Sequence, residues 1–156
     1  MCAVGATGPT VAQQETGLDE LDRPKGIRMI GLTVTHRRYV PYSHAHYAGH
    51  LVDGAYSLGL FGDVATEVCI RTDGDEGLFA SYSDVQFRSP VRAGDLLEVT
   101  AEVVAVGRRS RTLEFRAVVV ARGGGGAAAS SAAVLEDPVV ATTATGVVVV
   151  PVSTPD

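Results

Sequence analysis

Five stretches of the chain alternate between apolar and polar residues or are rich in β-branched residues, a pattern typical of β-strands. Turn-forming residues separate them, as in the break over 90–95. In the first stretch, one face carries Ile30, Leu32, Val34 and His36. The predicted strands cover residues 27–40, 78–89, 96–107, 111–122 and 141–152.

One long helix is predicted between the first two strands, because apolar residues from Leu51 to Cys69 recur at spacings of three and four. A second stripe at the same spacing carries Asp53, Tyr56, Leu60, Asp63 and Glu67. A glycine inside a helix costs about 1 kcal/mol relative to alanine. We therefore expect the helix backbone to pack closely against other groups at Gly54, Gly59 and Gly62.

The order of one strand, a long helix and four strands predicts an α+β fold, with the helix in the concave face of a five-stranded antiparallel sheet. A chain of 156 residues is long enough for one domain, which we expect over residues 27–152. Residues 1–26 are expected to be a disordered N-terminal tail. The Gly-, Ala- and Ser-rich segment 123–135 is expected to be a flexible loop.

The composition of the chain limits which binding partners and which cellular compartment we expect. The net charge of −5 and the pI near 5.3 argue against nucleic acid or an anionic membrane as partner. Cys2 and Cys69 lie far apart in the sequence, so a disulfide framework is not expected. The chain has no pattern of a signal peptide or membrane span at its start, and we expect a soluble cytoplasmic protein.

Four blocks carry a resemblance to a known family: HAHYAGHLVDGA, FGDVATE, DGDEGLF and VQFRSPVRAGD. In this order they resemble the β-aminoacyl-CoA ammonia lyases, a branch of the hotdog fold that also contains acyl-CoA thioesterases and dehydratases. The resemblance covers about residues 30–150. The family pattern has Asp where this chain has His44, and Asn where it has His50.

The resemblance implies a single hotdog domain that forms a homodimer or a higher homo-oligomer such as a hexamer, with sites between subunits. The implied substrates are coenzyme A thioesters, and neither a metal nor an organic cofactor is implied. The implied reaction is the elimination of ammonia or an amine from a β-aminoacyl-CoA to give the enoyl thioester, or the reverse addition.

Asp63 and Glu67 are candidate catalytic residues, because they are four residues apart and so share one helical face. A partly desolvated carboxylate has a raised pKa and suits the removal of the proton next to a thioester carbonyl. It would also attract the substrate ammonium. The alternative is a solvated helix face or a salt bridge to an arginine, such as Arg88 or Arg92.

The start of the helix is a candidate substrate-binding site. Backbone N–H groups of Gly49, His50 and Leu51 are expected at its positive end, where they can bind a thioester oxygen and stabilise an enolate. The alternative is an ordinary glycine-containing helix start. Asp53 falls in the first turn, where its charge favours the helix dipole more simply than it would serve catalysis.

His44, His46 and His50 lie in the loop before the helix, and no Cys or acidic residue completes a familiar metal-ligand set nearby. His46 and Tyr47 match the family block, so they are the preferred acid/base or thioester-positioning pair. His44 and His50 either alter the choice of substrate or are exposed loop residues.

The turn before the fourth predicted strand is basic, with Arg108, Arg109 and Arg111. In a hotdog protein this turn lies within reach of the coenzyme A phosphates, and the forked guanidinium suits phosphate. The alternative is an exposed basic hairpin on an acidic protein.

Three functions remain open on the sequence alone. The first is the carbon–nitrogen lyase, the second an acyl-CoA thioesterase of the same fold, and the third a non-catalytic protein that binds acyl thioesters. A lyase conserves the thioester, whereas a thioesterase releases free thiol.

Overall fold

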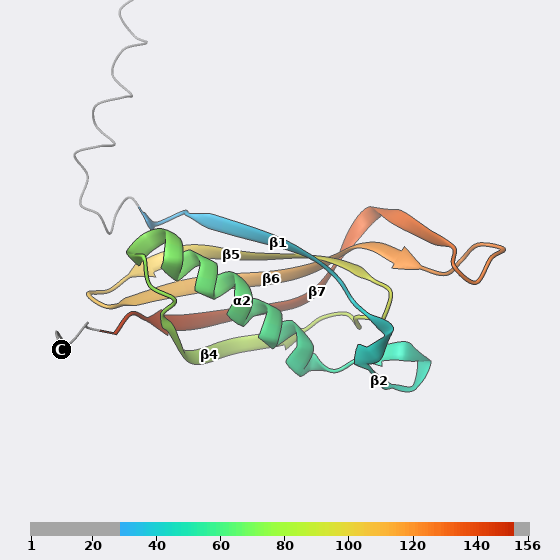
Figure 1. Cartoon of the computed structure of the whole chain (residues 1–156), viewed down its shortest axis with the longest axis horizontal. Helices are drawn as coiled ribbons and strands as arrows, with labels where there is room; N and C mark the ends of the chain where they lie inside the picture. Colours follow the sequence, from blue (N-terminus) through green and yellow to red (C-terminus); the bar gives the residue numbers. More distant parts are fainter. Residues whose placement is uncertain (1–28, 152–156) are drawn as a thin grey trace, which may run out of the picture.

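The computed structural model describes residues 29–151. One α-helix lies across one face of a five-stranded sheet, and a small two-stranded sheet precedes the helix (Figure 1). The elements are β1 Thr33–Tyr39, η2 Tyr42–His44, β2 Ala45–Tyr47, η3 Ala48–His50, β3 Leu51–Val52, α2 Gly54–Asp73, β4 Leu78–Phe87, β5 Leu96–Val106, β6 Ser110–Gly123 and β7 Ala132–Val149.

The large sheet has the order β1-β5-β6-β7-β4, and every neighbouring pair is antiparallel. Helix α2 lies within contact of all five strands. Phe61, Val64 and Val68 of the helix are completely buried, and they meet equally buried strand residues such as Leu97 and Leu113. The predicted α+β fold is confirmed.

Both ends of α2 are capped. Asp53 is the N-cap residue, and its Oδ1 accepts a hydrogen bond of 2.9 Å from the backbone N–H of Tyr56. At the other end Gly74 adopts a left-handed conformation with φ 70°, and its N–H donates to the carbonyl of Ile70. These caps set the helix over Gly54–Asp73.

The close packing expected at three helix glycines is found at one of them. A Cβ atom on Gly54 would lie 2.6 Å from the ring of Phe87. The same atom on Gly59 or Gly62 would meet nothing within 4 Å among the described residues. The expectation was wrong for these two because they lie on the helix side that faces away from the sheet.

Two strand boundaries also differ from the prediction. Residues 29–32 form a turn, with Gly31 at φ 86°, so that β1 starts only at Thr33. At the other end of the chain, β6 runs to Gly123 and β7 begins at Ala132.

The flexible loop predicted over 123–135 is therefore wrong at its edges, because Gly123 pairs with Ala132 and Arg122 with Ala133. Composition cannot distinguish an unpaired Ala-rich segment from one that a neighbouring strand holds by backbone hydrogen bonds. The predicted N-terminal tail lies outside the described residues. Within residues 29–151, no helix is long and apolar enough to cross a membrane.

Candidate active site

The segment between β1 and α2 protrudes from the body of the protein, and residues 42–50 are all exposed. It folds as two short 3-10 turns around β2, and β2 pairs with β3 (Figure 1). Gly49 and His50 both have positive φ values, 74° and 61°. A left-handed conformation suits glycine at position 49, whereas His50 adopts it less readily.

The helix starts five residues later than the sequence suggested. Gly49, His50 and Leu51 belong to a 3-10 turn and to β3, and α2 begins at Gly54. The expectation that these three residues form the positive end of the helix was therefore wrong. Helix geometry gives that position to the N–H groups of Gly54 and Ala55, since Tyr56 is already capped by Asp53.

A cavity of about 420 Å³ lies at this helix start. Its lining includes the predicted site residues Tyr47 and Leu51, together with the carboxylate of the N-cap residue Asp53. On the opposite wall, β4 and the segment after it contribute side chains that the sequence did not single out. The lining residues are Tyr47, Leu51, Val52, Asp53, Gly54, Ser57, Phe87, Arg88, Ser89, Pro90, Val91 and Thr142.

His46 stands beside this cavity. Its Nδ1 lies 3.8 Å from Oδ2 of Asp53, and its ring packs edge-to-face on Tyr47 with centroids 4.5 Å apart. Oδ1 of Asp53 thus caps the helix, while Oδ2 faces the imidazole at ion-pair distance rather than hydrogen-bond distance.

The other two loop histidines rest on tyrosines. His44 packs on Tyr56, with ring centroids 4.7 Å apart, and the ring centroids of His50 and Tyr42 are 6.1 Å apart. Both histidines are exposed. In the described part of the chain, no group of three or more His, Cys, Asp or Glu side chains could hold a metal ion.

Asp63 lies in a different place, a groove between α2 and β1, and Glu67, one turn further along α2, contacts His36 of this groove. This groove has a volume of about 350 Å³ and is lined by Thr35, His36, Arg37, Arg38, Leu60, Asp63 and Val99. Asp63 is ten residues beyond Asp53 on the helix, or about 15 Å along its axis. A single chain therefore does not bring Asp63 and Glu67 to the cavity that Tyr47 lines.

Glu67 is held between two basic side chains. Its Oε2 lies 2.5 Å from Nε2 of His36, and its Oε1 accepts from Arg71 at 2.7 Å. The hydrogen bond with His36, followed by that with Arg71, lowers the pKa of Glu67 below its usual value. The expectation of a base with a raised pKa was wrong for Glu67, and the alternative of a salt bridge to an arginine is correct.

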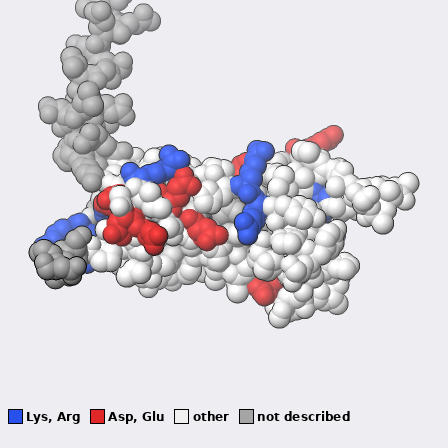
Figure 2. All heavy atoms as spheres, in the orientation of Figure 1, with Lys and Arg blue, Asp and Glu red and all other residues white. Residues whose placement is uncertain are grey.

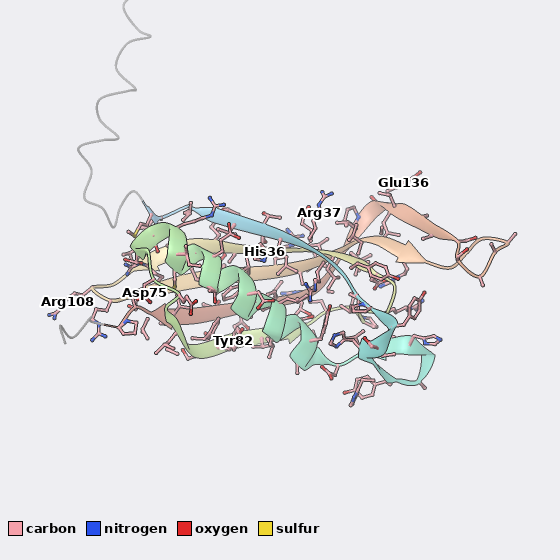
Figure 3. All side chains as sticks on the ribbon, in the orientation of Figure 1. His36, Arg37, Asp75, Tyr82, Arg108 and Glu136 are labelled. Carbon is pink, nitrogen blue, oxygen red and sulfur yellow. The ribbon has the colours of Figure 1, made fainter. Side chains whose placement is uncertain are left out.

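His36 was not among the predicted site residues, although a signal for it exists. The alternation along the first strand puts it on the same face as the buried Val34, toward the helix. In Figure 3 it lies between β1 and α2.

Acidic side chains gather over the C-terminal half of α2, whereas the surface around the helix start carries few charges (Figure 2).

The three arginines of the basic turn do not act as one group. Arg111 is 5% exposed, and its guanidinium binds Oδ1 of Asp73 at 2.6 Å, which ties β6 to the end of α2. Its predicted role as a coenzyme A ligand is not favoured by this structure, because the side chain is already buried in an ion pair. Arg108 and Arg109 are both exposed, and Arg108 lies at the opposite end of the molecule from β2 (Figures 1 and 3).

Comparison with known proteins identifies the family. A family model described as the thioesterase superfamily matches residues 49–128. A 3-aminobutyryl-CoA ammonia lyase from Acetoanaerobium sticklandii is 55% identical over 80 residues, which are 50% of this chain. The match spans 64% of that relative's own length, less than two thirds of it.

Solved structures agree with this assignment. The β-alanyl-CoA:ammonia lyase from Clostridium propionicum has a TM-score of 0.73 and 37% identity, over 78% of this chain and 87% of that one. A hexameric hotdog fold thioesterase from Campylobacter jejuni has a TM-score of 0.60 and 18% identity, over 73% and 79%. The chain thus belongs to the thioesterase superfamily, with the hotdog fold, and to the same family within it as the β-alanyl-CoA:ammonia lyase.

Proposed function

We propose that this protein is a carbon–nitrogen lyase that eliminates ammonia or an amine from a β-aminoacyl-CoA to give the enoyl thioester, or catalyses the reverse addition. The observation that carries the proposal is the contrast between relatives. Two proteins named as ammonia lyases are 55% and 37% identical to the chain, whereas the C. jejuni thioesterase is 18% identical.

The cavity at the start of α2 is the proposed binding place for the reacting thioester. The backbone N–H groups of Gly54 and Ala55 lie at the positive end of the helix, where they can bind the thioester oxygen. As the α-proton leaves, this oxygen gains negative charge. The helix start then stabilises the enolate more strongly than the neutral carbonyl.

His46 is the proposed base, oriented by Asp53 through the 3.8 Å contact. Its imidazole takes the proton from the α-carbon, and the electrons of that C–H bond form the new C=C bond. The C–N bond breaks at the neighbouring β-carbon, its electron pair goes to nitrogen, and the substrate ammonium leaves as neutral ammonia. Tyr47, packed on His46 and lining the cavity, positions the acyl group.

A second placement of the reaction, in the groove between α2 and β1, is favoured by one observation. The Asp63 carboxylate lines this groove and accepts no hydrogen bond from any residue within 29–151. It is thus available as a base, whereas Glu67 is engaged by His36 and Arg71. We rank it second because no helix start lies in the groove to stabilise the enolate.

Coenzyme A as the thiol carrier and a homo-oligomeric state belong to the same proposal. Strand β4 is an edge of the sheet, and Leu78 and Phe87 at its two ends are 62% and 59% exposed. A second copy of the chain can pair with this edge and cover both side chains. Arg108 and Arg109 are exposed at the opposite end of this chain from the cavity, so they are proposed as ligands for the phosphates of a coenzyme A whose thioester is bound by a second copy.

Product analysis tests the proposed reaction. The full chain is incubated with crotonyl-CoA or acryloyl-CoA and ammonia, and the products are followed by mass spectrometry together with a free-thiol assay. We expect a β-aminoacyl-CoA and no thiol above the enzyme-free control. Release of coenzyme A would instead identify a thioesterase, and binding of the thioester without any product would identify a binding protein.

A further inference from the structure

The exposed loop over residues 41–50 is held at its entry by the turn over 90–95. The N–H of Val40 donates to the carbonyl of Asp95 at 2.9 Å, and the N–H of Gly94 donates back to Val40 at 2.7 Å. Val40 itself is completely buried. The point where the chain leaves β1 is therefore fixed to this turn.

The exit of the loop is fixed to the same turn. The N–H of Ala93 donates to the carbonyl of His50, and the N–H of Val52 donates to Val91, both at 2.9 Å. Both ends of the segment that carries His46 thus depend on where one turn lies.

A buried ion pair holds that turn in place. Asp95 is completely buried, and its two carboxylate oxygens accept from Nε and Nη2 of Arg122, each at 2.8 Å. The carboxylate also accepts from the N–H of Arg92, and Arg122 donates to the carbonyl of Pro90 at 3.1 Å. Arg122 thereby contacts both the beginning and the end of the turn.

The extended β6–β7 hairpin supplies this arginine. Arg122 pairs with Ala133, beyond the point where Leu96, the first residue of β5, meets Ala121. The β6–β7 hairpin extends past the end of β5 (Figure 1), and its register and hydrogen bonds place Arg122 at the turn. Ala132 and Ala133, which were expected to belong to a flexible loop, thus form part of the hairpin that positions Arg122.

We propose that Asp95 and Arg122 are positioning residues for the active-site loop: their ion pair fixes the 90–95 turn, and the turn fixes where His46 and Tyr47 stand. That this loop belongs to the active site rests on the proposed function. The connection from ion pair to turn to loop ends rests only on the contacts described above.

Amide hydrogen exchange in the full-length chain tests the connection. The reporting amides are those of Val40, Val52, Ala93 and Gly94. In Asp95→Asn, which keeps the side-chain shape but removes the charge, we expect these amides to exchange at least tenfold faster. The matched control is Asp73→Asn, which breaks the other buried Asp–Arg pair at the far end of α2 and should leave them within twofold.

Equal acceleration in both variants, or none in Asp95→Asn, would overturn the proposal. If Asp95→Asn does not fold by circular dichroism, Arg122→Lys serves instead, since it keeps the charge but loses the two-pronged contact. With substrate, kcat should fall more than tenfold in the Asp95 variant and less than twofold in the control. A wild-type protein without lyase activity would refute the proposed function, while the exchange result would still decide this inference.

Discussion

At the scale of single residues, the charged side chains divide into those that hold the structure and those free to act. Arg111 and Glu67 were predicted as site residues from their type and spacing, and both are engaged by partners distant in sequence, Asp73 and His36. Spacing along one element cannot reveal such partners. His46, the proposed base, contacts Asp53 and Tyr47, which belong to the same local sequence block that suggested it.

The buried pair of Arg111 and Asp73 gives a prediction about stability. Arg111→Met should lower the free energy of unfolding by about 3–5 kcal/mol, because it leaves the Asp73 carboxylate with little access to water and no cationic partner, only the Thr72 hydroxyl. The matched variant Arg108→Met, at an exposed position, should change it by less than about 0.5 kcal/mol. Urea denaturation measures both. If Arg111→Met were as stable as the wild type but had lost affinity for coenzyme A, the result would instead support Arg111 as a coenzyme A ligand.

Glu67 gives a prediction about pH. Its pKa is lowered in the folded state, so its contribution to stability is fully present above the usual value of 4.5 and is lost as the pH falls through the folded value. The stability difference between the wild type and Glu67→Gln should therefore shrink as the pH falls below 4.5. Denaturation curves across this range measure it. A difference that grew on acidification would show that the carboxylate is not stabilised by His36 and Arg71.

At the scale of elements, the helix and the strands could be predicted from period alone, but their ends could not. The Asp53 cap fixes the helix start, and a 3-10 turn followed by the short strand β3 occupies the residues before it. The predicted oxyanion site consequently moves from Gly49 to Gly54. The paired ends of β6 and β7 were missed because their Gly and Ala residues carry no period.

Two glycines in different elements should respond oppositely to alanine. Gly59 on α2 has open space around it, so Gly59→Ala should stabilise the protein by about 0.5–1 kcal/mol through helix propensity. At Gly146 on β7, a Cβ would lie 2.6 Å from Phe79 and 2.8 Å from Phe115, so Gly146→Ala should destabilise by about 1–3 kcal/mol. Thermal denaturation compares the two. Destabilisation by Gly59→Ala would indicate that another copy packs closely on this face of α2.

At the scale of the whole molecule, the single domain and the order of helix and strands follow from the sequence, because local periods and turn residues specify them. The relative positions of the predicted site residues do not follow. The cavity beside His46 and the groove beside Asp63 lie at different places along α2, and the basic turn lies at the opposite end of the molecule from β2. How far the family's chemistry extends to this chain therefore depends on which of these places holds the thioester.

The most direct measurement is kcat/KM for ammonia elimination from a β-aminoacyl-CoA by the wild type, His46→Gln and Asp63→Asn. General acid–base catalysis typically contributes about 10²–10⁴-fold. We therefore predict that His46→Gln loses at least about a hundredfold, with its fold intact by circular dichroism, and that Asp63→Asn stays within about threefold of the wild type. The reverse result, a silent His46→Gln and an inactive Asp63→Asn, would contradict a site at the helix start and move the reaction to the groove between α2 and β1.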